Sequence, residues 1–113
     1  MARPKPQFRA HLIFNFAEHK VNRRRTFIFE ESGHRRVPLN MDGVDGLHTV
    51  GMWIDRAGEF REGDELDVDC RVILPEGFKD VTKPGVYFRL WDSGFFADGT
   101  VTETFAAEWL AEK

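Results

Sequence analysis

Residues 83–105, KPGVYFRLWDSGFFADGTVTETF, decide the fold of this chain. Two segments of alternating apolar and polar residues flank a polar DSG turn at 92–94, and Val86, Phe88 and Leu90 share one face. Alternation with a period of two is typical of a strand, and Asp, Ser and Gly favour a tight turn. The stretch therefore predicts a β-hairpin.

Four further segments predict strands because apolar residues recur at every second position. Residues 7–16 form the clearest, and RRRTFIFE at 23–30 places Phe27 and Phe29 on one face. We expect these two segments to pair as a hairpin. Residues 47–54 alternate again, and a long strand follows whose apolar face carries Leu66, Val68, Cys70, Val72 and Leu74.

The remaining segments give weaker signals. Residues 31–46 mix charges with Gly and Pro, which predicts a loop with a short edge strand at 37–41. RAGEFREGD at 56–64 indicates a tight turn, and residues 105–113 predict a helical turn or two, since Phe105 and Trp109 are four residues apart.

The chain has 113 residues, the size of one domain, and we expect an extended arm at 1–6 and a tail at 106–113. Short strands with frequent turns indicate an all-β barrel or sandwich, which periodicity alone does not separate. The one cysteine, Cys70, cannot form an internal disulfide, which favours a cytoplasmic protein. Neither a signal peptide nor a membrane-spanning segment is predicted.

Residues 84–101, PGVYFRLWDSGFFADGTV, resemble the closing hairpin of the third domain of elongation factor Tu, its C-terminal β-barrel. The other matches follow in the same order as in the family. They are FRAHLIF at 8–14, a basic pair and Thr at 24–26, SGHR at 32–35 where the family has Ser-Gly-Tyr-Arg, and the Gly-Asp of a Pro-Gly-Asp turn at 63–64. The resemblance implies a closed antiparallel barrel of about six strands, here as a stand-alone domain.

The same resemblance implies a translation-related role, because in the family this domain helps to hold the T-stem side of aminoacyl-tRNA. The chain departs from the family at three positions. Arg36 replaces a Pro, Leu74 replaces a basic residue, and Phe95 replaces an Arg.

A basic cluster predicts contact with RNA, such as tRNA, or with a translation-related protein, although the net charge is −3. Guanidinium groups suit phosphates because they donate two parallel hydrogen bonds. The ordinary alternative is a solvated charged surface that protects a strand edge. Lys20 flanks the cluster, whose candidate RNA-binding residues are Arg23, Arg24, Arg25, His34, Arg35 and Arg36.

A second hypothesis is a protein-interaction module without RNA binding. It would use an aromatic surface made of Trp91, Phe95 and Phe96, since exposed aromatic side chains favour protein partners. The two hypotheses differ in geometry. RNA binding needs Arg24, Arg35 and Arg36 on one patch, whereas the alternative needs the three aromatic side chains exposed together.

Catalytic and cofactor signals are weak. No segment matches the phosphate-binding loop of nucleotide-binding proteins, so we expect neither GTP binding nor GTP hydrolysis. The four histidines show no zinc spacing with each other or with Cys70, and the acidic segment 59–69 lacks calcium-loop spacing. Cys70 shares an apolar face, which predicts a buried, inert thiol. We therefore expect a non-enzymatic protein without a cofactor.

Overall fold

The described residues form a six-stranded barrel and a separate two-stranded sheet. The computed structural model describes residues 5–16, 26–29, 32–55, 57–92, 94–105 and 109. Within them the elements are β1 (Phe8–Phe14), β2 (Thr26–Phe29), β3 (His34–Met41), β4 (His48–Trp53), β5 (Gly58–Arg61), β6 (Glu65–Val72), the 3-10 helix η1 (Pro75–Gly77), β7 (Tyr87–Trp91) and β8 (Phe95–Thr104).

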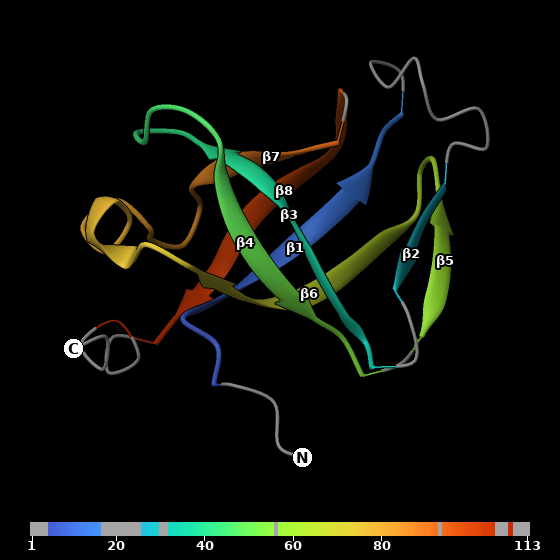
Figure 1. Cartoon of the computed structure of the whole chain (residues 1–113), viewed down its shortest axis with the longest axis horizontal. Coiled ribbons are helices and arrows are strands. Elements are labelled where there is room, and N and C mark those ends of the chain that lie inside the picture. The colour runs from blue at the N-terminus through green and yellow to red at the C-terminus, as the bar shows by residue number, and fades with distance from the viewer. Residues whose placement is uncertain are drawn as a thin grey trace.

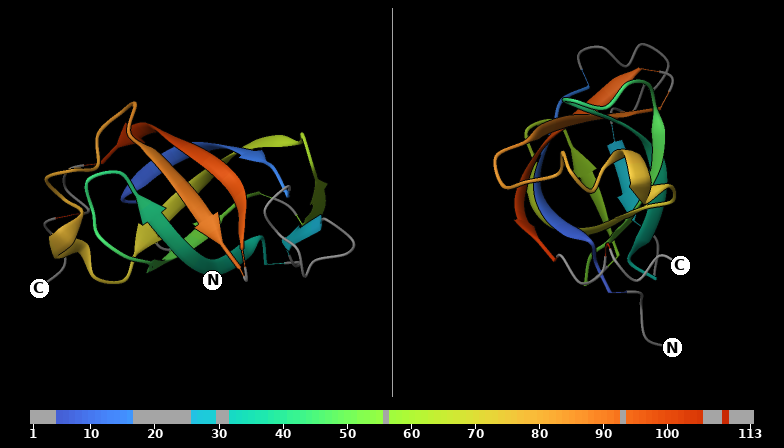
Figure 2. Two further views of the ribbon diagram at one scale, coloured as in Figure 1. Left: turned by 90° about the horizontal axis from the view of Figure 1, so that it is seen from above. Right: turned by 90° about the vertical axis from the view of Figure 1, so that its left-hand side faces the viewer.

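The barrel closes in the order β1-β6-β4-β3-β7-β8, and its neighbouring strands are antiparallel (Figure 1). The predicted hairpin is confirmed, because β7 pairs with β8. A closed antiparallel barrel was also the predicted fold class. In Figure 2 the β2–β5 sheet lies at one end of the molecule and η1 at the other.

Alternating side chains of the strands fill the barrel. Phe14, Phe27, Val68, Val72 and Phe88, which we expected to be buried together, all belong to one core cluster. Burial of these apolar side chains is the main stabilising contribution to the fold.

A group of stacked phenyl rings closes the end of the barrel beneath the β2–β5 sheet. The ring centroid of Phe14 lies 5.5 Å from that of Phe60 and 5.7 Å from that of Phe27. Phe27 in turn stacks on Phe96 of β8 at 4.8 Å. Aromatic packing thus joins the small sheet to the barrel.

Gly99 on β8 provides the space for a core ring. It pairs in register with Phe88 of β7, and a Cβ added at Gly99 would lie 2.2 Å from Cζ of that ring. Phe88 is fully buried and contacts Phe8 edge-on, with the ring centroids 6.2 Å apart. Phe8 also stacks on Trp109 of the tail.

Three expectations about strands were wrong. β2 pairs with β5 and not with β1, because β6 and β8 occupy both edges of β1. β3 is longer than predicted and is no edge strand, since it pairs with β4 on one side and β7 on the other. Residues predicted as a tight turn include the strand β5.

Two expectations concerned the ends of elements. Leu74 was expected to continue the apolar face of β6, but that strand ends at Val72 and the Leu74 side chain is exposed. The predicted helical tail lies outside the described residues except for Phe105 and Trp109. Among the described residues, no helix is long and apolar enough to cross a membrane.

Candidate functional site

Two arginines flank a glycine on the outer face of β3, β4 and β6. Arg36 of β3 and Arg71 of β6 both pair in register with Gly51 of β4, and we call these three residues the arginine row. Arg36 is exposed, whereas Arg71 donates a hydrogen bond from Nη1 to the backbone oxygen of Lys5 at 2.7 Å. The described part of the N-terminal arm therefore lies beside this row.

A second row crosses the same three strands two residues away. His34 of β3 pairs with Trp53 of β4, which pairs with Asp69 of β6, and we call these the aromatic row. The imidazole of His34 stacks on the indole at 4.6 Å between centroids, with an angle of 26° between the planes. A Cβ at Gly51 would lie 3.0 Å from Cη2 of Trp53, so the indole rests over the glycine.

The surroundings of His34 favour a neutral ring. Burial, and secondly the charge of Arg36, lower the pKa of His34 below its usual value. Its Nε2 atom is buried and has no hydrogen-bond partner. At neutral pH the stack on Trp53 is therefore a contact between two uncharged rings.

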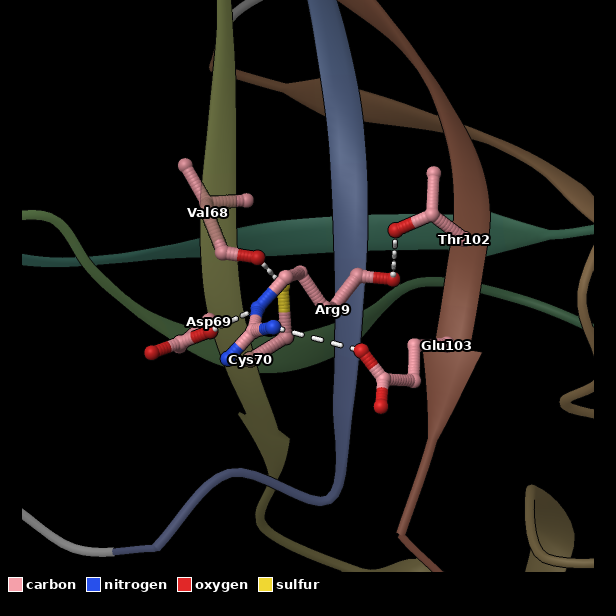
Figure 3. A network of polar contacts seen from close by, with 6 residues as sticks. All are labelled: Arg9, Val68, Asp69, Cys70, Thr102 and Glu103. Atoms are coloured by element: carbon pink, nitrogen blue, oxygen red, sulfur yellow. Dashed lines mark hydrogen bonds and ion pairs between the residues drawn. The ribbon is translucent and has the colours of Figure 1, made fainter.

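A polar network continues the aromatic row onto β1 and β8 (Figure 3). Nε of Arg9 donates to Oδ1 of Asp69 at 2.8 Å, and Nη1 of Arg9 donates to Oε1 of Glu103 at 3.2 Å. The hydrogen bond with Asp69 makes the largest contribution to raising the pKa of Arg9. Two carboxylates thus hold this guanidinium in one orientation.

Trp53 also forms part of the wall of a hollow of about 290 Å³, which we call the Trp53 hollow. The residues that line it are Arg9, Trp53, Ile54, Asp55, Asp67 and Asp69. Oδ1 of Asp67 is hydrogen-bonded to Nδ1 of His11 at 2.8 Å, and Oε1 of Glu65 is hydrogen-bonded to Nε2 of the same ring at 2.7 Å. Hydrogen bonds with Asp67 and then Glu65 raise the pKa of His11.

The predicted basic cluster is only partly brought together. His34 and Arg36 lie on the outer face, but Arg35 lies on the opposite side of β3, because side chains alternate along a strand. Nη1 of Arg35 donates to the oxygen of Ile28 at 2.8 Å, and its guanidinium lies 4.5 Å from the centroid of the Phe27 ring. Lys20, Arg23, Arg24 and Arg25 lie outside the described residues.

The predicted aromatic surface is wrong in one member. Phe96 is 1% exposed and belongs to the stacked phenyl rings, so it cannot contact a partner together with its neighbours. Trp91 and Phe95 are partly exposed, and the Arg89 guanidinium lies 3.7 Å from the centroid of the Phe95 ring.

Three exposed aliphatic side chains, those of Leu47, Ile73 and Leu74, lie together elsewhere on the molecule. Leu47, His48, Thr49, Ile73 and Leu74 line a hollow of about 250 Å³, which we call the aliphatic hollow. Leu74 and Ile73 are 65% and 58% exposed, the largest values among the exposed large apolar residues described. Large exposed apolar side chains that lie together favour a protein contact.

Sequence reasoning missed Arg71 as a member of the site, because only the pairing of β4 with β6 brings it beside Gly51. Cys70, one residue before it, is fully buried, and burial raises the pKa of its thiol. Within the described ranges, no group of three or more His, Cys, Asp or Glu side chains could hold a metal ion.

No protein-family model matches the chain, and no curated protein matches it either.

Proposed function

We propose that this protein is a non-enzymatic binding module, similar to the third domain of elongation factor Tu, that contacts RNA through the arginine and aromatic rows. The observation that carries the proposal is the placement of Arg36 and Arg71 on either side of Gly51. Arg36 is exposed, and a guanidinium can donate two hydrogen bonds to one phosphate, while Arg71, whose Nη1 donates to Lys5, adds a second positive charge on the other side of Gly51.

The neighbouring aromatic row supports the same class of partner. RNA-binding proteins commonly stack unpaired bases on aromatic side chains while basic residues contact the phosphates. Here the His34 and Trp53 rings lie directly beside Arg36 and Arg71. A local patch of this kind is compatible with a net charge of −3, because the two carboxylates of β6 that lie nearest to it, Asp69 and Asp67, pair with Arg9 and His11.

The closed barrel also restricts how a partner can bind. Each described barrel strand pairs with a neighbour on both sides over at least part of its length, which leaves the barrel little edge for an additional strand. We therefore expect a partner of the barrel to contact side chains of the outer face. This favours a face with several rigidly held side chains, such as the two rows.

The proposal is tested by measuring the binding of fluorescently labelled tRNA over a series of salt concentrations. Affinity should fall steeply with salt, because each neutralised phosphate releases counterions. R36A and R71A should each weaken binding and reduce the salt slope by about one unit. R61A is the matched control, since Arg61 is exposed on the separate β2–β5 sheet. Absence of binding at low salt, or R36A and R71A proteins that bind like the wild type, would refute the proposal.

The aliphatic hollow favours a second candidate, a protein partner. In this case a partner captured from cell extract should be lost in the L74D variant and retained in R36A and after nuclease treatment. Loss of the captured partner on nuclease treatment would favour RNA instead.

A further inference from the structure

We infer that the Trp53 hollow takes an unpaired guanine base of the RNA whose backbone the arginine row contacts. The inference rests on the proposed function and adds to it the state of the RNA and the base that is read. It starts from the position of the hollow beside the two arginines. Trp53 follows Gly51 by two residues on β4, and Asp69 precedes Arg71 by two on β6.

Two residues of a strand span roughly 7 Å, so the hollow and the arginine row are about one nucleotide apart. A phosphate held between Arg36 and Arg71 can therefore place its own base, or the next one, at the hollow. The volume of about 290 Å³ lies just below the range for small-molecule pockets, roughly 300 to 1,000 Å³, so the hollow suits a small ligand such as a single base.

The wall of the hollow is already held in place. The Trp53 indole rests over Gly51 and stacks on His34, so a base that packs against it orders no new side chain. Rigid aromatic surfaces bind bases with little loss of conformational entropy. The base must be unpaired, because in a duplex its faces stack on the neighbouring base pairs.

The polar lining selects the kind of base. The carboxylates of Asp55, Asp67 and Asp69 line the hollow, where Oδ1 of Asp67 already contacts His11 and Oδ1 of Asp69 already accepts from Arg9. A carboxylate oxygen can accept more than one hydrogen bond, so the Asp67 carboxylate, which is 70% exposed, can still accept from a base. Guanine carries two adjacent donors on its Watson–Crick edge, N1–H and the N2 amino group, and one carboxylate can accept both. Uracil offers one N–H between two carbonyl oxygens, which the carboxylates would repel.

Arg9 completes the discrimination between bases. Its guanidinium is fixed between Asp69 and Glu103 at the edge of the hollow (Figure 3). Guanine has acceptors at O6 and N7 that an arginine commonly contacts. Guanine, with two adjacent donors on one edge and acceptors at O6 and N7, therefore fits the lining better than uracil.

The test compares labelled RNA octamers that differ in a single central base. An octamer of uridines with one central guanosine should bind the wild-type protein about tenfold more tightly than octauridine. Replacement of that guanosine by inosine, which lacks the N2 amino group, should remove most of the gain. D67N and W53L should each abolish the preference for guanosine, while D80N, at an exposed position beyond η1, should keep it.

The salt slope separates this inference from the proposed function. D80N should leave the slope for octauridine unchanged, whereas R36A should reduce it. Equal affinities for the two octamers, with a normal salt slope, would overturn the guanine inference and leave RNA binding intact. Absence of binding by either octamer at low salt would overturn both. Unfolding curves check that W53L is folded, and D67N provides the same test without altering the aromatic stack.

Discussion

The most severe effect of a single added methyl group is expected at Gly99. In G99A the new Cβ would lie 2.2, 2.4 and 2.8 Å from three ring carbons of Phe88, whereas carbon atoms pack best at about 3.5 to 4.0 Å. The ring would have to move by more than about 1 Å. It cannot move outwards, because it is fully buried and contacts Phe8.

Overpacking of this kind typically costs about 1 to 3 kcal/mol, and the closeness of the three contacts places G99A at the upper end, about 3 kcal/mol. Gly99 is not among the glycines with positive φ, so no backbone strain adds to this value. With a urea m-value of about 1.5 kcal/mol/M, the unfolding midpoint should fall by about 2 M.

Urea unfolding followed by tryptophan fluorescence measures the effect, and a double-mutant cycle with F88L identifies its cause. Leucine at position 88 leaves room for the new methyl group, so the double variant should be more stable than the sum of the two single effects predicts. A G99A protein within ~0.5 kcal/mol of the wild type would show that the Phe88 ring does not occupy this space.

Three further predictions concern the core and two titrating groups. F14A should lower the free energy of unfolding by about 3 to 5 kcal/mol, because the ring stacks within the phenyl cluster, and a loss below ~0.5 kcal/mol would refute this packing. Tyr87 is the only tyrosine, so its titration can be followed by ultraviolet absorbance. Its pKa should be about 12, because burial and then the hydrogen bond to Asp98 favour the neutral phenol. D98N should lower this pKa, and an unchanged value would contradict the assigned bond. His11 has a raised pKa in the folded state, so its stabilising contribution is complete below about pH 6.5 and is lost as the pH rises through the raised value. The difference in unfolding free energy between wild type and H11Q should therefore be larger at pH 6 than at pH 8.5. The reverse order would refute the hydrogen bonds of His11 with its two carboxylates.

Local alternation in the sequence was enough to predict an all-β fold and its core, whereas the closed barrel was implied only by the resemblance. The alternation in β1, β6 and β7 is clear because one face of each strand is buried and the other is solvated. The pairing of β2 with β5 was not predictable in the same way. Phe27 and Phe60 both indicate a buried face, but periodicity does not say which strand lies opposite which.

The candidate site shows the same limit. Arg35 and Arg36 are adjacent in the sequence, yet they lie on different faces of β3, whereas Arg71 is remote in the sequence and lies beside Gly51. A run of basic residues along a strand divides between two faces, so clustering in sequence is a poor guide to clustering in space. The charge pattern could indicate that arginines belong to the candidate site, but only strand pairing could show which of them lie side by side on one face.

The position of β1 has a consequence for synthesis of the chain. Among the described barrel strands, β1 is the first to be synthesised, but its two neighbours, β6 and β8, comprise residues 65–72 and 95–104. Until the last strand has emerged, one edge of β1 has no partner and the barrel is open. Contacts between distant parts of a chain form slowly, since a long loop must close before they are made. The barrel of the nascent polypeptide should therefore stay sensitive to proteases until β8 has emerged, and removal of β8 should leave no folded fragment.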